Sequence, residues 1–154
     1  MKYAEYKEQK QKEFDALPIF WAFGKEQFKE AMEARGLTAK DTDKIYSLGA
    51  GGYYLKTDAQ LIHDYMNKPD EMAELMQDYD FAKDAIYEEM CNHEFSINDQ
   101  GNWDVCNCYY GDRLYGKEER EKYFDAMNWS ETTRRAWKDA QARYYRDAEA
   151  NDWF

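Results

Sequence analysis

The sequence predicts an α+β fold, a small antiparallel sheet packed by several amphipathic helices, in one domain that covers residues 1–154. Short apolar runs bounded by glycine and proline are typical of strands, and stretches with apolar residues three and four positions apart are typical of helices. Aromatic residues make up 18% of the chain, which indicates a core built around their rings and argues against disorder.

The first third of the chain predicts a helix, a strand, a second helix and a hairpin. Residues 2–17 have helical spacing and end at Pro18, and the apolar run at residues 19–23 (IFWAF) predicts a buried strand. Residues 25–35 predict a helix that stops at Gly36. Residues 44–48 and 53–56 predict two strands joined by a glycine-rich loop, which lacks the Gly-Lys-Ser/Thr ending of a phosphate-binding loop. We interpret this loop as a hairpin turn rather than an anion site.

Residues 58–104 carry almost all of the excess charge, with thirteen acids against two bases, while the flanks are nearly neutral and the whole chain has a net charge of −11. Three helices are predicted here, beginning near Thr57, at Pro69 and near Asp80. We expect them to bury these residues: Leu61, Ile62, Tyr65 and Met66; Met72, Leu75, Met76 and Tyr79; Phe81, Ala85, Ile86 and Met90.

The acids of these helices have few lysines four positions away to balance them. One reading is a solvated face that only confers solubility. The other is an interface for a cationic protein, and it assigns contact to six carboxylates: Glu71, Glu74, Asp78, Asp84, Glu88 and Glu89.

The last third of the chain predicts a hairpin and two helices. Residues 93–97 and 103–110 flank the turn-forming residues 98–102, residues 117–127 predict a helix, and Ser130 is the expected N-cap of a helix that runs to about Ala150. Its expected inner stripe is Trp137, Ala140, Tyr144 and Ala148. Its expected basic side is Arg134, Arg135, Lys138, Arg143 and Arg146. Acids interrupt this side, so we expect it to match the acidic segment internally rather than to bind nucleic acid.

Three cysteines and a histidine fall within eighteen residues, as Cys91, His93, Cys106 and Cys108. These are ligand types for structural zinc, but the spacing C-x-H-x12-C-x-C is unusual. In one hairpin register all four side chains share a face. In the other register the large apolar residues share a face and the ligand pairs separate. Burial of the apolar set favours the second register, and so buried thiols without a metal.

Catalysis has weak support in the sequence. His93 and Glu94 could act as acid and base, and Cys91 beside His93 could act as a nucleophile, but no hydrolase or metalloprotease motif surrounds them. We therefore expect a protein that is not an enzyme and uses no cofactor. The alternative is a small metal-dependent module or enzyme centred on His93, Glu94 and the three cysteines.

The amino terminus is charged throughout and no apolar run is long enough for a membrane span, so we expect a cytoplasmic protein without a membrane partner. Three cysteines fit a reducing compartment. A net charge of −11 disfavours duplex nucleic acid as a partner and favours a cationic protein surface.

Three stretches, IFWAFGKEQFKEAM, KIYSLGAGGYYLKTD and EEMCNHEF, resemble a family of small uncharacterised proteins from bacteriophages and prophages of Gram-positive bacteria. The resemblance covers residues 18–97 and includes an aromatic run, a glycine-rich turn and an Asn-His-Glu-aromatic motif at residues 92–95. Cys91 does not belong to this pattern. The resemblance implies no catalytic residues.

A phage setting implies a role against host defence, where small acidic proteins occupy the cationic nucleic-acid groove of a nuclease. The expected function is therefore a non-enzymatic inhibitor of a host defence nuclease, such as an anti-CRISPR protein. Another alternative is a phage accessory protein that forms homo-oligomers through aromatic side chains.

Overall fold

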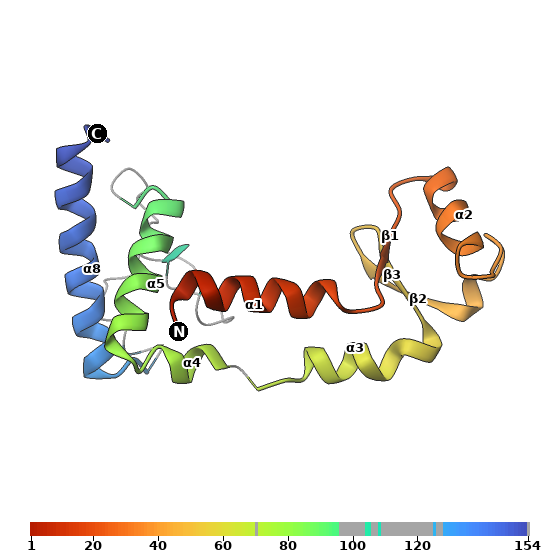
Figure 1. Cartoon of the computed structure of the whole chain (residues 1–154), viewed down its shortest axis with the longest axis horizontal. Helices are drawn as coiled ribbons and strands as arrows, with labels where there is room; N and C mark the ends of the chain where they lie inside the picture. Colours follow the sequence, from red (N-terminus) through yellow and green to blue (C-terminus); the bar gives the residue numbers. More distant parts are fainter. Residues whose placement is uncertain (70, 96–103, 106–107, 109–124, 126–127, 154) are drawn as a thin grey trace. The chain divides into compact units, whose positions relative to one another are not determined.

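The structure is a computed structural model that describes residues 1–69, 71–95, 104–105, 108, 125 and 128–153 (Figure 1). It confirms the α+β fold, with helices and a three-stranded antiparallel sheet. The chain divides into two compact units, one of residues 7–69 and one of residues 1–6 with 70–154. We call them the sheet unit and the helical unit and describe each by itself. The single domain over residues 1–154 stays a prediction.

The sheet unit holds β1 (Phe20–Trp21), β2 (Ile45–Gly49) and β3 (Gly52–Leu55), with β3 in the middle and antiparallel to both neighbours. The pairing places Gly49 opposite Gly52, so Ala50 and Gly51 form a two-residue turn. Both turn residues have positive φ, 51° and 85°, as a type I′ turn requires. The glycine-rich loop is therefore the hairpin turn that the sequence predicts.

The core of the sheet unit is a cluster of Phe20, Met32 and Ile45. Met32 comes from α2 (Lys25–Glu33). The chain leaves this helix through Gly36, whose φ is 72°. The expectation that residues 19–23 form a fully buried strand is wrong, because only Phe20 and Ala22 are buried while Phe23 is 72% exposed. The run alternates between two faces, as a strand with one solvated face does.

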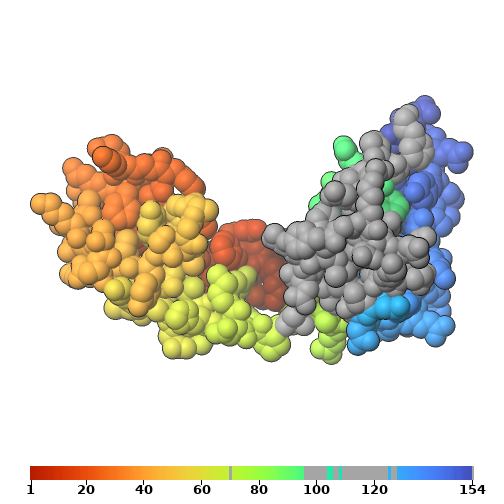
Figure 2. Space-filling model, turned by 180° about the vertical axis from the view of Figure 1, so that it is seen from behind, coloured from red at the N-terminus to blue at the C-terminus, as the bar shows by residue number. Residues whose placement is uncertain are grey.

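Helix α3 (Ala59–Met66) also belongs to the sheet unit and follows the short 3-10 turn η2 (Lys56–Asp58); another such turn, η1 (Thr42–Lys44), precedes β2. Figure 2 shows the yellow atoms of this part of the chain from behind. Ile62 is buried as expected. Leu61 and Met66 are 58% and 54% exposed, so their assignment to the inner face is wrong. Positions 61, 62, 65 and 66 point over a wide arc of the helix, and only Ile62 among them is fully buried.

The helical unit is built on α4 (Glu71–Leu75), α5 (Tyr79–Asn92) and α8 (Glu131–Ala150). Helices α5 and α8 lie side by side and run in the same direction (Figure 1). The first residues of α1 (Tyr3–Asp15) pack here as well, through edge-to-face contacts of Tyr3 and Tyr6 with Phe81. Most residues of the predicted inner stripes of this unit are buried: Met72, Met76, Phe81, Ala85, Ile86, Met90, Trp137, Ala140, Tyr144 and Ala148. Leu75 and Tyr79 of the same prediction are only half-buried, at the edge of this core.

Helices α5 and α8 are joined by the same group of a tyrosine, an aspartate and an arginine at two positions, eight residues apart on each helix. The hydroxyl of Tyr79 donates to Asp139 and that of Tyr87 donates to Asp147, at 2.5 and 2.6 Å. The guanidinium groups of Arg135 and Arg143 lie over the same two rings, 4.7 and 3.7 Å from their centroids. The residue numbers of both partners rise together, from Tyr79 and Asp139 to Tyr87 and Asp147, because the two helices run parallel.

The predicted hairpin at residues 93–110 is wrong where the structure describes it. Helix α5 continues to Asn92, residues 93–95 form a turn with Glu94 at a φ of 48°, and residues 104–105 are helical. The loop at residues 98–102 lies outside the described residues, and so does nearly all of the helix predicted at residues 117–127.

Candidate functional site

The structure places the six predicted contact carboxylates on α4, on α5 and at the junction between them. Glu71, Glu74 and Asp78 are exposed, and Asp84 and Glu88 are half-buried. Glu89 is wrongly assigned to this surface, because it is buried with 7% of its area exposed. Its position on α5 falls beside the apolar stripe. We call the remaining five residues the acidic surface: Glu71, Glu74, Asp78, Asp84 and Glu88.

Two residues of the acidic surface also accept hydrogen bonds from the N-terminal backbone of helices. The carboxylate of Asp78 accepts a hydrogen bond from the backbone N–H of Phe81 at 2.8 Å and is the N-cap of α5. That of Asp84 accepts one from the backbone N–H of Tyr3 at 3.3 Å, which places an acid at the positive end of the α1 dipole. These donors carry no formal charge, so both bonds leave the net negative charge in place.

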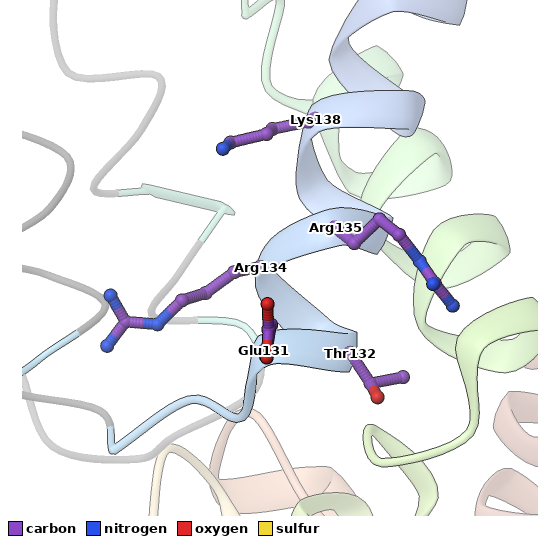
Figure 3. Close-up of a pocket in the computed structure, with 5 residues that line it drawn as sticks. All are labelled: Glu131, Thr132, Arg134, Arg135 and Lys138. Atoms are coloured by element: carbon purple, nitrogen blue, oxygen red, sulfur yellow. The ribbon is translucent and has the colours of Figure 1, made fainter.

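The basic side of α8 has contacts of its own. Arg134 pairs with Asp125 at 2.8 Å and Arg143 with Asp147 at 3.6 Å, both outside residues 58–104. Arg134 and Lys138 extend from one side of α8 and Arg135 from the other, around a hollow of about 620 Å³ (Figure 3). Arg135 reaches the acidic segment through the ring of Tyr79. The internal charge match expected between this basic side and residues 58–104 stays a prediction, because the ion pairs described here join Arg134 and Arg143 to acids outside that segment, and Arg135 and Arg143 contact it through the rings of Tyr79 and Tyr87.

A second group of polar side chains converges at the end of α5. Sγ of Cys108 lies 3.2 Å from Nε2 of His93 and 3.3 Å from Oε2 of Glu89, and the last two atoms are 3.4 Å apart. Glu89 lies in the last turn of α5 and His93 is the C-cap residue of this helix, four residues further on and therefore on the same side. We call these three residues the Glu-His-Cys cluster.

The first turn of α1 supports this cluster. The hydroxyl of Tyr3, itself buried, donates to Oε1 of Glu89 at 2.8 Å. Burial and the hydrogen bond to Glu89 raise the pKa of Tyr3 far above its ordinary value. Because Oε1 is held by this donor, Oε2 is the oxygen that faces His93 and Cys108.

The Glu-His-Cys cluster does not have the geometry of a catalytic relay. In such a relay the carboxylate orients one ring nitrogen while the other nitrogen activates the nucleophile. Here the same nitrogen, Nε2 of His93, faces both the thiol of Cys108 and the carboxylate of Glu89. One oxygen, one nitrogen and one sulfur thus point at a common centre, with the ligand atoms all within 4.8 Å of one another.

The other candidates for chemistry lie elsewhere. Cys91 is half-buried against the helical core and interacts with Tyr87, Arg143 and Asp147. Burial raises the pKa of its thiol, so little of the nucleophilic thiolate is present at neutral pH. Glu94 is exposed and lines a hollow with Cys91, whereas the carboxylate described next to His93 is that of Glu89. Cys106 lies outside the described residues.

A family model matches residues 2–104 of this chain, which is more than half of its length. The chain belongs to DUF7659, a family of unknown function. The DUF7659 match includes Glu89 and His93 but ends before Cys108 and α8. No curated protein and no solved structure matches the chain.

The sequence contains a signal for the Glu-His-Cys cluster, namely Glu89 and His93 at helical i, i+4 spacing. The signal is hidden if residues 93–97 are taken as a strand, because the two side chains then belong to different elements. None of the helices in the described parts of the chain combines the length and the apolar character that crossing a membrane needs.

Proposed function

We propose that this DUF7659 protein is a non-enzymatic inhibitor that docks its acidic surface on a cationic protein groove which otherwise binds nucleic acid. The observation that supports the proposal most is the exposure of Glu71, Glu74 and Asp78 in a segment with little positive charge. Residues 71–92 contain seven acids and a single base, Lys83. Such a surface attracts cationic partners and repels phosphate backbones.

The way the carboxylates are held supports the proposal further. A carboxylate paired with lysine or arginine contributes little net field, whereas one held by a backbone N–H keeps its full charge. Asp78 and Asp84 are of the second kind. Both are fixed in position by these bonds, so less side-chain freedom is lost when a partner binds.

The more specific proposal is an inhibitor encoded by a phage and directed at a host defence nuclease, with CRISPR effectors as the first class to test. It rests on the resemblance of residues 18–97 to phage and prophage proteins and on the acidic charge. Nucleases of this kind hold DNA or RNA in grooves lined by arginine and lysine, which are the side chains that carboxylates pair with.

The test uses two triple variants with the same change in charge. The α4 variant, Glu71→Gln/Glu74→Gln/Asp78→Asn, neutralises the three exposed carboxylates of the acidic surface and keeps the cap of α5, because asparagine and aspartate cap helices equally well. In Glu26→Gln/Glu30→Gln/Glu33→Gln, three exposed acids of α2 are neutralised as the matched control.

Each tagged protein is incubated with lysate of a host that expresses its defence systems, and any captured nuclease is then purified and assayed for cleavage. The proposal predicts that the parent and the α2 variant (Glu26, Glu30 and Glu33 changed) capture the nuclease and inhibit its cleavage of nucleic acid. The α4 variant (Glu71, Glu74 and Asp78 changed) should do neither. If both variants lose capture and inhibition equally, or if neither variant loses them, the proposal is contradicted.

A further inference from the structure

We propose that Glu89, His93 and Cys108 form a transition-metal site and that zinc is the ion it takes. The inference is independent of the acidic surface, because none of the three residues belongs to that surface. It differs from the zinc site considered from the sequence, Cys91, His93, Cys106 and Cys108, because Glu89 is a ligand and Cys91 is not, and Cys106 lies outside the described residues. Three ligand atoms of different chemistry, one oxygen, one nitrogen and one sulfur, lie close to one another at the end of α5.

The distances between the ligand atoms fit a tetrahedral ion. Zinc binds cysteine sulfur at about 2.3 Å, histidine nitrogen at about 2.0–2.1 Å and carboxylate oxygen at about 2.0–2.2 Å, so neighbouring ligand atoms of a tetrahedral site are roughly 3.3–3.6 Å apart. In this protein the three separations are 3.2, 3.3 and 3.4 Å. An ion would therefore require shifts of only a few tenths of an ångström.

The charges of the cluster also fit a cation. A buried carboxylate needs a compensating partner: the hydroxyl of Tyr3 supplies a hydrogen bond to Glu89 but no positive charge, and Nε2 of His93 lies 3.4 Å from its other oxygen. A divalent ion at the common centre would neutralise the carboxylate together with a thiolate at Cys108. The side-chain amide of Asn92 lies 3.4 Å from Oε1 as a second donor. Outer partners of this kind fix the orientation of metal ligands.

The ligand set selects among metals. Calcium and magnesium bind oxygen ligands, so a site that offers one nitrogen and one sulfur disfavours both. Cysteine, histidine and glutamate together suit zinc. Three protein ligands leave a fourth position for water or another ligand, and His93 and Cys108 reach solvent, so an ion can enter without unfolding the helical unit.

The test titrates the whole chain, reduced and stripped of metal, with cobalt(II) and then with zinc(II). Cobalt reports a bound thiolate by its charge-transfer absorption band, and zinc should displace it at one ion per chain. Cys108→Ser and His93→Ala should abolish the band. Cys91→Ser is the matched control, because the structure places this thiol of α5 outside the cluster, and it should leave the band unchanged.

A further variant tests the supporting hydrogen bond. Tyr3→Phe keeps all three ligands and should weaken zinc binding about 10- to 100-fold, as loss of an outer-shell partner does. Circular dichroism of each variant shows that it is folded. Absence of a thiolate band in the parent protein, a band that survives Cys108→Ser, or a band lost in Cys91→Ser would each overturn the proposal and identify the cluster as a hydrogen-bonded group without a metal.

Discussion

The hydroxyl of Tyr3 lies 2.8 Å from Oε1 of Glu89 and joins the first turn of α1 to the last turn of α5 across 86 residues of sequence. Both side chains are buried. The bond fixes the orientation of the one acid of α5 that faces inward, and with it the oxygen that meets His93 and Cys108. A residue near the amino terminus thereby determines the geometry of the Glu-His-Cys cluster.

The Tyr3 bond predicts a loss of stability in alkali. Burial and Glu89 raise the pKa of Tyr3 above its unfolded value of about 10, so the folded protein holds this proton more tightly than the unfolded chain. The contribution to stability is complete below pH 10 and falls as the pH rises above it. Tyr3→Phe should unfold more easily at neutral pH, by about 1–3 kcal/mol, and lose less additional stability above pH 10.

Urea unfolding of the parent, of Tyr3→Phe and of Tyr46→Phe from pH 8 to 11 measures this effect. Tyr46 is exposed, so its variant should follow the parent. Parallel loss of stability above pH 10 in all three proteins would show that Tyr3 is not the titrating group.

Replacing Gly51, in the turn between β2 and β3, should destabilise the protein more than replacing Gly36, which follows α2. Gly36 and Gly51 both have positive φ, which costs an alanine about 1 kcal/mol. A Cβ at Gly36 meets nothing within 4 Å, whereas one at Gly51 would lie 2.7 Å from the ring of Phe23 and 3.0 Å from the carbonyl oxygen of Ala22. Gly51→Ala should therefore destabilise the protein more than Gly36→Ala in thermal unfolding, and equal effects would contradict this packing.

The cap of α8 predicts a third effect on stability. Oγ of Ser130 accepts the backbone N–H of Thr133 at 3.2 Å. Ser130→Ala should lose about 1 kcal/mol of unfolding free energy, because one helix N–H loses its acceptor, while Ser130→Asp should keep most of it. Chemical denaturation of the three proteins measures this, and an Ala variant as stable as the Asp variant would argue against the cap.

Local patterns predict much of this fold. The stripe of α8 from Trp137 to Ala148 and its cap at Ser130 follow from helical periodicity and N-cap preference, and the turn at Ala50 and Gly51 follows from the glycines around it. In each case the information lies within a few residues of the element it specifies.

The hairpin predicted at residues 93–110 is wrong in its described part because residues 93–95 end helix α5 instead of starting a strand. Helix α5 runs to Asn92, Glu94 has a φ of 48°, and the backbone N–H of Phe95 donates to the carbonyl oxygen of Met90, as at the C-terminus of a helix. The burial of Glu89 could not be predicted from the local sequence either. An acid beside the apolar stripe of a helix is buried only where a hydrogen-bond donor from another part of the chain meets its carboxylate. That donor is Tyr3, 86 residues away.

The central claim is that the acidic surface of α4 and α5 is an interface, and the salt dependence of binding tests it most directly. The affinity for a captured nuclease is measured at about 0.1 M and about 1 M salt, between which the screening length falls from about 10 Å to about 3 Å. If carboxylates of the acidic surface pair with arginine and lysine of the nuclease, the parent and the α2 variant should lose at least about tenfold in affinity when the salt is raised from about 0.1 M to about 1 M. An affinity that does not change with salt, or one that the α4 variant retains in full, would contradict the claim.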